Sequence, residues 1–214
     1  MATLDIKKIK YDTDQILAHF GLERKIGNCV LLQKWLDVTI APNYVLSEQL
    51  ERKRLRLIEQ GSLWNEEELK MHFISYLFDV ADMEIPKKMQ LFYERSLVAT
   101  VNNTPLSVIC DALLATPLGV NTPNIPYFFL QEFKKGKKAQ DDAEGQMLIA
   151  MLIAQELNKN GQMVYGCYLQ GQYWNFAILS ETTYCLSLSY DATRTNELIQ
   201  IIHILQNLKN RIVF

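Results

Sequence analysis

Two different spacings of hydrophobic residues divide the chain into a helical first part and a later part rich in strands. Apolar residues recur every three or four positions over residues 31–38, 47–60 and 65–80, which predicts three helices. Asn65 is a suitable N-cap for the third helix, because its side chain can accept a backbone hydrogen bond and three glutamates follow it. Residues 1 to about 60 are therefore expected to be helices and loops.

The pattern changes after residue 91 to alternating or continuous apolar residues, which predicts strands. The expected strands cover residues 92–101, 106–115, 126–134, 163–170, 172–179 and 182–190. A helix is expected over 141–158, apolar nearly all round and hence covered on several sides, and another over 195–211. A buried helix that joins two strands indicates a crossover between parallel neighbours.

This order of elements predicts an α/β fold, with a mixed central β-sheet flanked by helices. We divide the chain into a helical N-terminal region, residues 1–61, and an α/β domain, residues 62–214. The 214 residues, 49% of them hydrophobic and 21% charged, are typical of a globular protein with a real core. Charges where a signal peptide would be apolar, and the lack of ~18 consecutive apolar residues, predict a cytoplasmic protein without a membrane partner.

The cysteines and histidines show no metal-binding pattern. The four cysteines are far apart and lack C-x-x-C spacing, so we expect reduced, mostly buried thiols. His19, His72 and His203 are equally dispersed, and each is expected to be an ordinary surface or half-buried histidine.

The formal net charge of −2 does not indicate a dedicated nucleic-acid coat protein, but two local basic runs occur. The first, within residues 52–56, is interpreted as a solvated helix face. The second follows the strand that ends at residue 134. Its lysines Lys135, Lys137 and Lys138 are candidates for contacts with nucleic-acid phosphates.

Three charged side chains near the ends of apolar strands carry the candidate chemistry. Glu132 and Lys134 are two residues apart, so on a strand they point to the same face, about 6–7 Å from each other. Asp111 stands near the end of the preceding strand, and pairing of the two strands would bring its carboxylate to Glu132. Two carboxylates suit Mg²⁺ or Mn²⁺, and a neighbouring lysine can orient a water or stabilise charge on a phosphate. This combination predicts hydrolysis of phosphodiesters.

These residues resemble the PD-(D/E)XK nuclease superfamily, which has the restriction-endonuclease-like fold, and the chain is similar to its bacterial members. The resemblance covers roughly residues 62–180 and lies in Asp111, in the E-x-K motif Glu132-Phe133-Lys134, and in the helix with DDAEGQMLIAMLIA. Gln146 matches a glutamine of several branches. Glu66 best matches an acidic residue of the family's opening helix, with Glu67 or Glu68 as alternatives. The proline that often precedes the aspartate is replaced by Cys110.

The resemblance implies a metal-dependent nuclease that hydrolyses phosphodiester bonds of DNA. Asp111 and Glu132 would bind Mg²⁺ or Mn²⁺, Lys134 would assist the water, and Gln146 and Glu66 would support the site. A homodimer, or a larger defence or mobile-element complex, is an expected assembly. Two alternatives stay open: a catalytically silent member that binds nucleic acid or protein, and a structural protein in which the trio is only an ion-pair network.

Overall fold

A mixed sheet of eight strands forms the centre of the protein. The computed structural model describes residues 11–119, 121–134 and 142–212. Seven strands follow the order β1-β7-β6-β5-β4-β3-β2, and β8 pairs with β6. Both parallel and antiparallel pairs occur, so the predicted α/β fold with a mixed sheet flanked by helices is confirmed.

Three long antiparallel strands form one side of the sheet: β2 (Gln90–Val101), β3 (Thr104–Leu118) and β4 (Thr122–Lys134). Asn102 and Asn103 make the β2–β3 turn with φ of 47° and 63°, a left-handed conformation that asparagine tolerates. The β3–β4 hairpin extends to Leu118 and Thr122, further than the predicted strands, because residues 116–118 also pair with residues 122–124, although both segments contain a proline.

The other side of the sheet contains shorter strands: β5 (Val164–Gln170), β6 (Tyr173–Ser180), β7 (Thr183–Leu186) and β8 (Tyr190–Asp191). Helix α7 (Ala143–Asn158) joins β4 to the parallel strand β5, so the predicted crossover is confirmed. Asp142 caps this helix by accepting a hydrogen bond from the Gly145 amide, 3.0 Å away. Residues 143–154 of the helix are buried except at Gln146, as its apolar sequence predicts.

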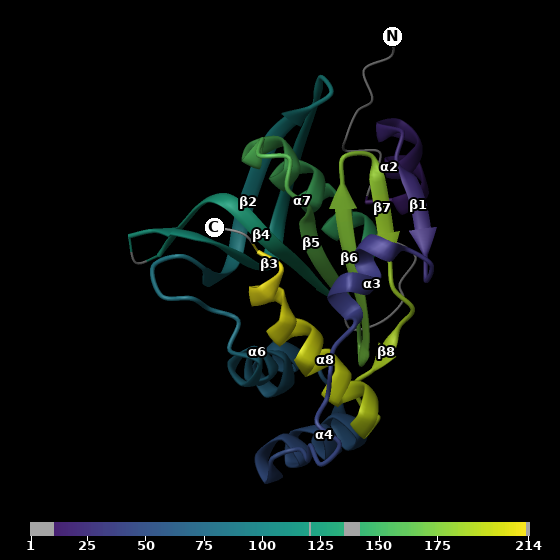
Figure 1. The fold of residues 1–214 in the computed structure, drawn as a ribbon, viewed down its shortest axis with the longest axis vertical. Coiled ribbons are helices and arrows are strands. Elements are labelled where there is room, and N and C mark those ends of the chain that lie inside the picture. Colours follow the sequence, from purple (N-terminus) through teal and green to yellow (C-terminus); the bar gives the residue numbers. More distant parts are fainter. Residues whose placement is uncertain (1–10, 120, 135–141, 213–214) are drawn as a thin grey trace.

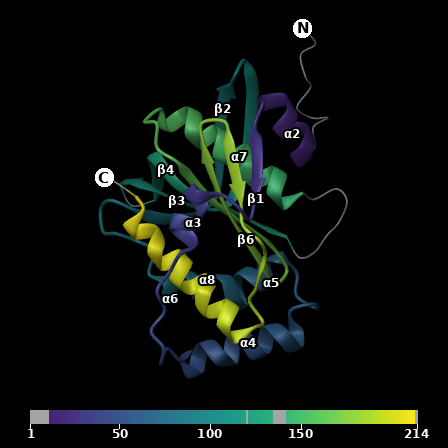
Figure 2. The same cartoon turned by 45° about the vertical axis from the view of Figure 1, so that its right-hand side comes forward.

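Each face of the sheet carries its own hydrophobic core. Helix α7 and α2 (Thr13–Phe20) pack on one face. Helix α8 (Thr195–Asn207), which continues as the short 3₁₀ helix η2 (Leu208–Asn210), packs on the other with the helices at the lower end in Figure 1. Figure 2 shows α8 running across the front of the sheet, with α7 behind it. The sheet is therefore the middle layer of three.

The N-terminal region is part of this fold and is not entirely helical. Helices α3 (Val30–Leu36) and α4 (Glu48–Gln60) are close to the predicted ones, but β1 (Glu23–Ile26) was not predicted and pairs in parallel with β7. Trp35 of α3 is buried in the core, where its indole N–H donates to the carbonyl oxygen of Ile204 at 2.8 Å. The sheet and core thus use residues from both sides of the division at residue 61.

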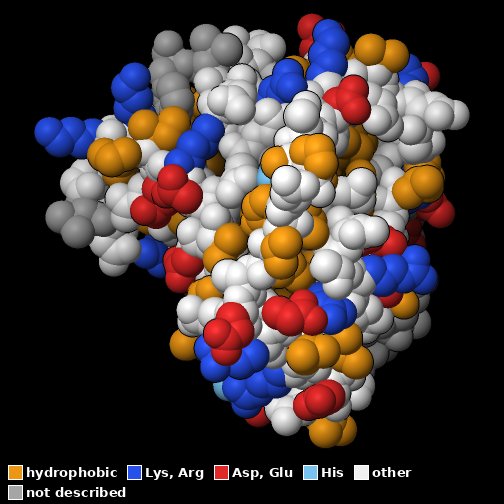
Figure 3. Space-filling model, turned by 60° about the horizontal axis from the view of Figure 1, so that its bottom comes forward, with side chains coloured by type: hydrophobic (Ala, Val, Ile, Leu, Met, Phe, Trp, Pro, Cys, Tyr) orange, Lys and Arg blue, Asp and Glu red, His pale blue; other side chains and the backbone are white. Residues whose placement is uncertain are grey.

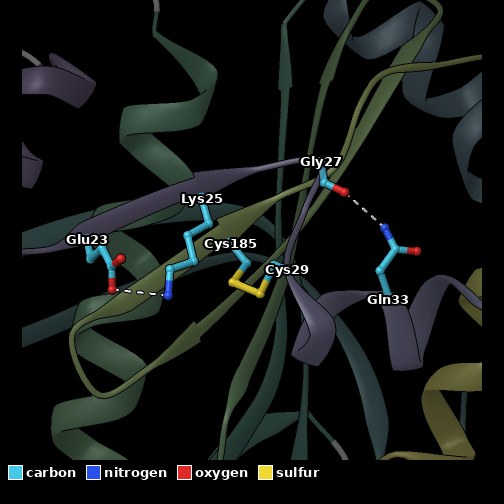
Figure 4. Close-up of a disulfide and its surroundings, with 6 residues drawn as sticks. All are labelled: Glu23, Lys25, Gly27, Cys29, Gln33 and Cys185. Carbon is cyan, nitrogen blue, oxygen red and sulfur yellow. Dashed lines mark hydrogen bonds and ion pairs between the residues drawn. A yellow bond between two sulfur atoms is a disulfide. The ribbon is translucent and has the colours of Figure 1, made fainter.

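A disulfide links Cys29 to Cys185 and so joins the end of the β1 segment to β7 (Figure 4). The expectation of four reduced cysteines is wrong for this pair, because the fold brings together two residues that are 156 positions apart. Cys110 and Cys167 are free and buried, as expected. Disulfides are rare in reducing compartments such as the cytoplasm. The cysteines therefore no longer support the predicted cytoplasmic location.

The predicted helix over residues 65–80 exists in three parts: α5 (Glu66–Leu69), a π-helical turn (Lys70–Ile74) and α6 (Ser75–Ala81). Asn65 is its N-cap, as predicted. The Asn65 side chain accepts from the Glu68 amide, and the Glu68 side chain accepts from the Asn65 amide in return. The π turn inserts one extra residue per turn and shifts the faces of the helix that follow it.

The end of the molecule that contains α4 and α8 mixes both signs of charge around hydrophobic side chains (Figure 3). Within the basic run of residues 52–56, Arg54 is paired with Glu51 at 2.5 Å, and Lys53 lies 5.5 Å from the centre of the Tyr76 ring. Arg52 and Arg56 are exposed, as a solvated face requires. Arg54 departs from that interpretation, because its side chain is only 13% exposed and donates to the carbonyl oxygen of Thr193. In the described part of the chain, no helix is both long and apolar enough to cross a membrane.

Candidate functional site

Strands β3 and β4 separate at the predicted site. Their pairing runs from the β3–β4 turn as far as Ala112 and Gln131. Beyond that point the Phe133 amide of β4 donates to the Oδ2 atom of Asp111 at 2.7 Å, instead of to a strand carbonyl. The Asp111 carboxylate is thus fixed between the ends of the paired parts of the two strands. As predicted, Asp111 lies next to the E-x-K motif, since Phe133 is the middle residue of that motif.

Glu132 is the most unusual side chain of the site. It is 0% exposed, and neither carboxylate oxygen has a hydrogen-bond partner of ordinary geometry in the described part of the chain. Burial raises the pKa of Glu132 well above its usual value, the nearby Asp111 carboxylate raises it further, and Lys134 lowers it. A buried carboxyl group without a donor requires a proton or a cation.

Lys134 and Glu66 also come together, although they belong to different elements. The Lys134 ammonium lies 3.8 Å from the Glu66 Oε2 atom, and the lysine side chain is only 14% exposed. The other two candidate glutamates have different partners: Glu68 closes the N-cap, and Glu67 lies 2.8 Å from the ammonium of Lys70. Of the three alternatives, Glu66 is the one that contacts the E-x-K lysine.

Gln146 extends from the first turns of α7 towards β3, where its amide donates to the carbonyl oxygen of Ile109 at 3.3 Å. That carbonyl belongs to the second residue before Asp111, so Gln146 lies beside the site. The phosphate-contact candidates Lys135, Lys137 and Lys138 are outside the described residues.

Lys70 belongs to this site and was not predicted. Its ammonium contacts three carboxylates: Glu94 at 2.6 Å, Glu67 at 2.8 Å and Asp111 at 3.4 Å. Burial alone would lower the pKa of Lys70, but hydrogen bonds with Glu67 and Glu94 outweigh burial and raise the pKa well above its usual value. Lys70 is therefore a permanent positive charge at the Asp111 side of the site.

Two departures from regular backbone place this lysine. Lys70 begins the π turn, a feature that is common at functional sites. Glu94, which stands between the paired residues Tyr93 and Arg95 of β2 and is itself without a paired residue in β3, has a φ of 50°. A left-handed conformation costs a non-glycine residue about 1–3 kcal/mol and has to be held by its surroundings. Here it accompanies the ion pair between Glu94 and Lys70.

Tyr11 is a further neighbour that sequence reasoning missed. Burial is the main factor that raises the pKa of Tyr11, and the charge of nearby Glu132 adds to it. The residue is held by contact between its backbone and Gly145 of α7, where a Cβ atom would lie 1.7 Å from the Tyr11 carbonyl oxygen. Gly145 is the one sequence signal for this approach, because a glycine early in a helix is unfavourable without such a reason.

The residues fit a divalent cation in part. The Glu132 oxygens, which receive no hydrogen bond from an N–H donor among the described residues, lie next to Asp111, and Mg²⁺ commonly uses one or two carboxylates together with water and phosphate oxygens. Within residues 11–119, 121–134 and 142–212, however, no group of three or more His, Cys, Asp or Glu side chains is arranged to hold a metal ion. Comparison of the sequence with protein-family models and with curated proteins finds no match.

Proposed function

We propose that this protein is a metal-dependent nuclease with a restriction-endonuclease-like core, and that it hydrolyses phosphodiester bonds of DNA. The observation that carries the proposal is the carboxyl group of Glu132, which is fully buried beside Asp111 and receives no hydrogen bond from an N–H donor within residues 11–119, 121–134 and 142–212. Lys134 lies two residues away on the same strand. Because β3 and β4 are no longer paired at this point, the side chains of Asp111 and Glu132 can lie between the two strands. The resemblance to the PD-(D/E)XK motif accounts for their order in the sequence.

Each residue of the site has a role that its contacts allow. Asp111, fixed by the Phe133 amide, and Glu132 provide the carboxylates for Mg²⁺ or Mn²⁺. The bound cation supplies Lewis-acid activation of the scissile phosphate and of the attacking water. Lys134, held by Glu66, orients that water or stabilises the charge that develops on the phosphate. Gln146, on the adjoining helix, supports the β3 side of the site.

A cleavage assay tests the proposal. Supercoiled plasmid and end-labelled single-stranded and double-stranded DNA are incubated with Mg²⁺ or Mn²⁺, and with EDTA as the metal-free control. Asp111→Asn and Lys134→Met are each expected to lower the rate about 10²–10³-fold. Lys209→Met is the matched control, since Lys209 also pairs with a single carboxylate, that of Asp82, but lies on η2. Cleavage that survives Asp111→Asn and Lys134→Met contradicts the proposed mechanism.

A specific observation favours a second candidate function. The Lys70 ammonium, 3.4 Å from Asp111, already pairs with the carboxylates on that side of the site. In a catalytically silent protein, this lysine would take the place of the metal, and the same fold would serve as a nucleic-acid-binding or protein-interaction module. Removal of the ammonium leaves several carboxylates that could then receive a cation.

Calorimetric titration with Mn²⁺ separates the two candidates. The nuclease proposal predicts that the wild-type protein binds Mn²⁺ and that Asp111→Asn does not. The silent candidate predicts no binding by the wild type but measurable binding by Lys70→Met. Lys209→Met again serves as the control for the loss of one positive charge.

A further inference from the structure

A pocket of about 240 Å³ lies between the π turn and strands β2 and β3. Its polar lining includes Lys70, Glu94 and Asp111, and its apolar lining includes Met71, Tyr93 and Phe133. Because Asp111 belongs both to this pocket and to the candidate site, whatever occupies the pocket lies directly beside the proposed reaction. The volume is below the ~300–1,000 Å³ typical of pockets for drug-sized ligands, so it suits a single small ring system.

The polar groups of the pocket do not suit a simple anion. An anion such as a free phosphate would meet the carboxylates of Glu67, Glu94 and Asp111 around one ammonium. The Lys70 ammonium already occupies the position between these carboxylates that a free cation would take. The lining instead offers a donor and several acceptors close together, which suits a neutral group with both kinds of hydrogen-bonding atom along one edge.

The apolar groups of the pocket suit the faces of a flat ring. Tyr93 is 43% exposed and Met71 is 70% exposed, so both present apolar surface at the mouth, while Phe133 lies buried at the base. Aromatic side chains at the edge of a groove commonly stack on bases. A nucleobase is a flat ring with such a polar edge, and a nucleic-acid strand held at the neighbouring candidate site would carry one.

We infer that this pocket receives one unpaired base, guanine in particular, from the strand held at the site, a role that rests on the proposed nuclease function. Guanine presents two adjacent N–H donors and the O6 acceptor along one edge. The Glu94 carboxylate accepts from the donors and the Lys70 ammonium donates to O6, while Tyr93 stacks on the ring. Adenine has only one such donor group on this edge and matches the pair less well.

Binding of short labelled DNA tests this role separately from cleavage. Fluorescence anisotropy in EDTA compares single-stranded oligonucleotides that carry dG, dA or an abasic position at one central site. The wild-type protein is expected to bind the dG strand about tenfold more tightly than the abasic strand, the scale of one stacked base. Tyr93→Ala should remove most of that difference. Tyr173→Ala, which truncates a tyrosine of similar exposure (46%) on β6, should retain it.

A second variant tests recognition of the polar edge of the base and leaves the Tyr93 ring in place. Glu94→Gln replaces one acceptor atom by a donor, so the preference for dG over dA should fall while stacking remains. Equal binding of the three strands by the wild-type protein, no binding at all, or a dG preference that survives both variants would overturn the inference. Metal-dependent cleavage with equal binding of the strands would still support the nuclease. Base-selective binding without cleavage would leave the pocket role standing and reject the nuclease.

Discussion

Substitution of Gly145 by alanine should destabilise the protein, although the same change usually stabilises a helix by about 0.5–1 kcal/mol. A Cβ atom at this position would lie 1.7 Å from the carbonyl oxygen and 2.6 Å from the carbonyl carbon of Tyr11. Both atoms are backbone, so no rotation of a side chain relieves the overlap. The segment before α2 has to move away from α7.

The size of the effect follows from what that movement disturbs. The amide and hydroxyl of Thr13 donate to the Oδ2 atom of Asp142 at 2.9 and 2.7 Å, and Ile16 of α2 is fully buried. Overpacking at such a contact costs about 1–3 kcal/mol, and hydrogen bonds to a charged acceptor contribute about 1.5–3 kcal/mol each when lost completely. After subtraction of the gain in helix propensity, we expect a net loss of about 1–3 kcal/mol.

Urea unfolding followed by far-UV circular dichroism measures this loss. Thermal unfolding should show a decrease of roughly 2–4 °C in Tm for each kcal/mol in a chain of this size. Gly166→Ala is a useful comparison, because the atoms nearest to its Cβ would belong to the flexible side chains of Met151 and Met147, whose sulfur atoms lie at 2.7 and 2.9 Å. Equal or greater stability of Gly145→Ala would refute the close approach of Tyr11 to α7.

Two other predictions concern stability. With EDTA present, the free energy of unfolding of the wild type should fall relative to that of Glu132→Gln as the pH rises above about 4.5. Above this pH the Glu132 carboxyl group ionises readily in the unfolded chain but not in the folded protein, where burial raises its pKa. Urea unfolding at pH 4.5 and pH 8 checks this, and a constant difference contradicts it. Cys185→Ala should lose up to about 5 kcal/mol, since the disulfide closes a loop across 156 positions. The unfolded, unreduced wild type should then expose two thiols to a thiol reagent, and four exposed thiols would exclude the disulfide.

Local patterns were sufficient for the parts of the site that lie on one strand or one hairpin. Glu132 and Lys134 share a face because side chains alternate along a strand, whatever the rest of the fold does. Asp111 lies near them because it belongs to β3, which follows the Asn102-Asn103 turn and pairs with β4 in the next hairpin. The contact between Glu66 and Lys134 required only that α5, which begins at Glu66, approach the end of β4.

Non-local geometry explains what the sequence patterns missed. Strand β1 is four residues long and charged, so it lacks alternating apolar residues and depends on pairing with β7. No spacing rule connects Cys29 with Cys185. Lys70 looks like an ordinary helix residue, and only the π turn together with the left-handed Glu94 directs its ammonium to Asp111. Such irregular backbone is held by tertiary contacts and has no simple sequence signature.

The central claim is that Asp111 and Glu132 together bind the catalytic cation. Anomalous diffraction from crystals soaked in Mn²⁺ tests it most directly, with Asp111→Asn crystals as the control. An anomalous peak is expected between the two carboxylates in the wild type, and no such peak in the variant. A saturating soak that leaves this position without a peak, or places Mn²⁺ only elsewhere on the protein, would contradict it.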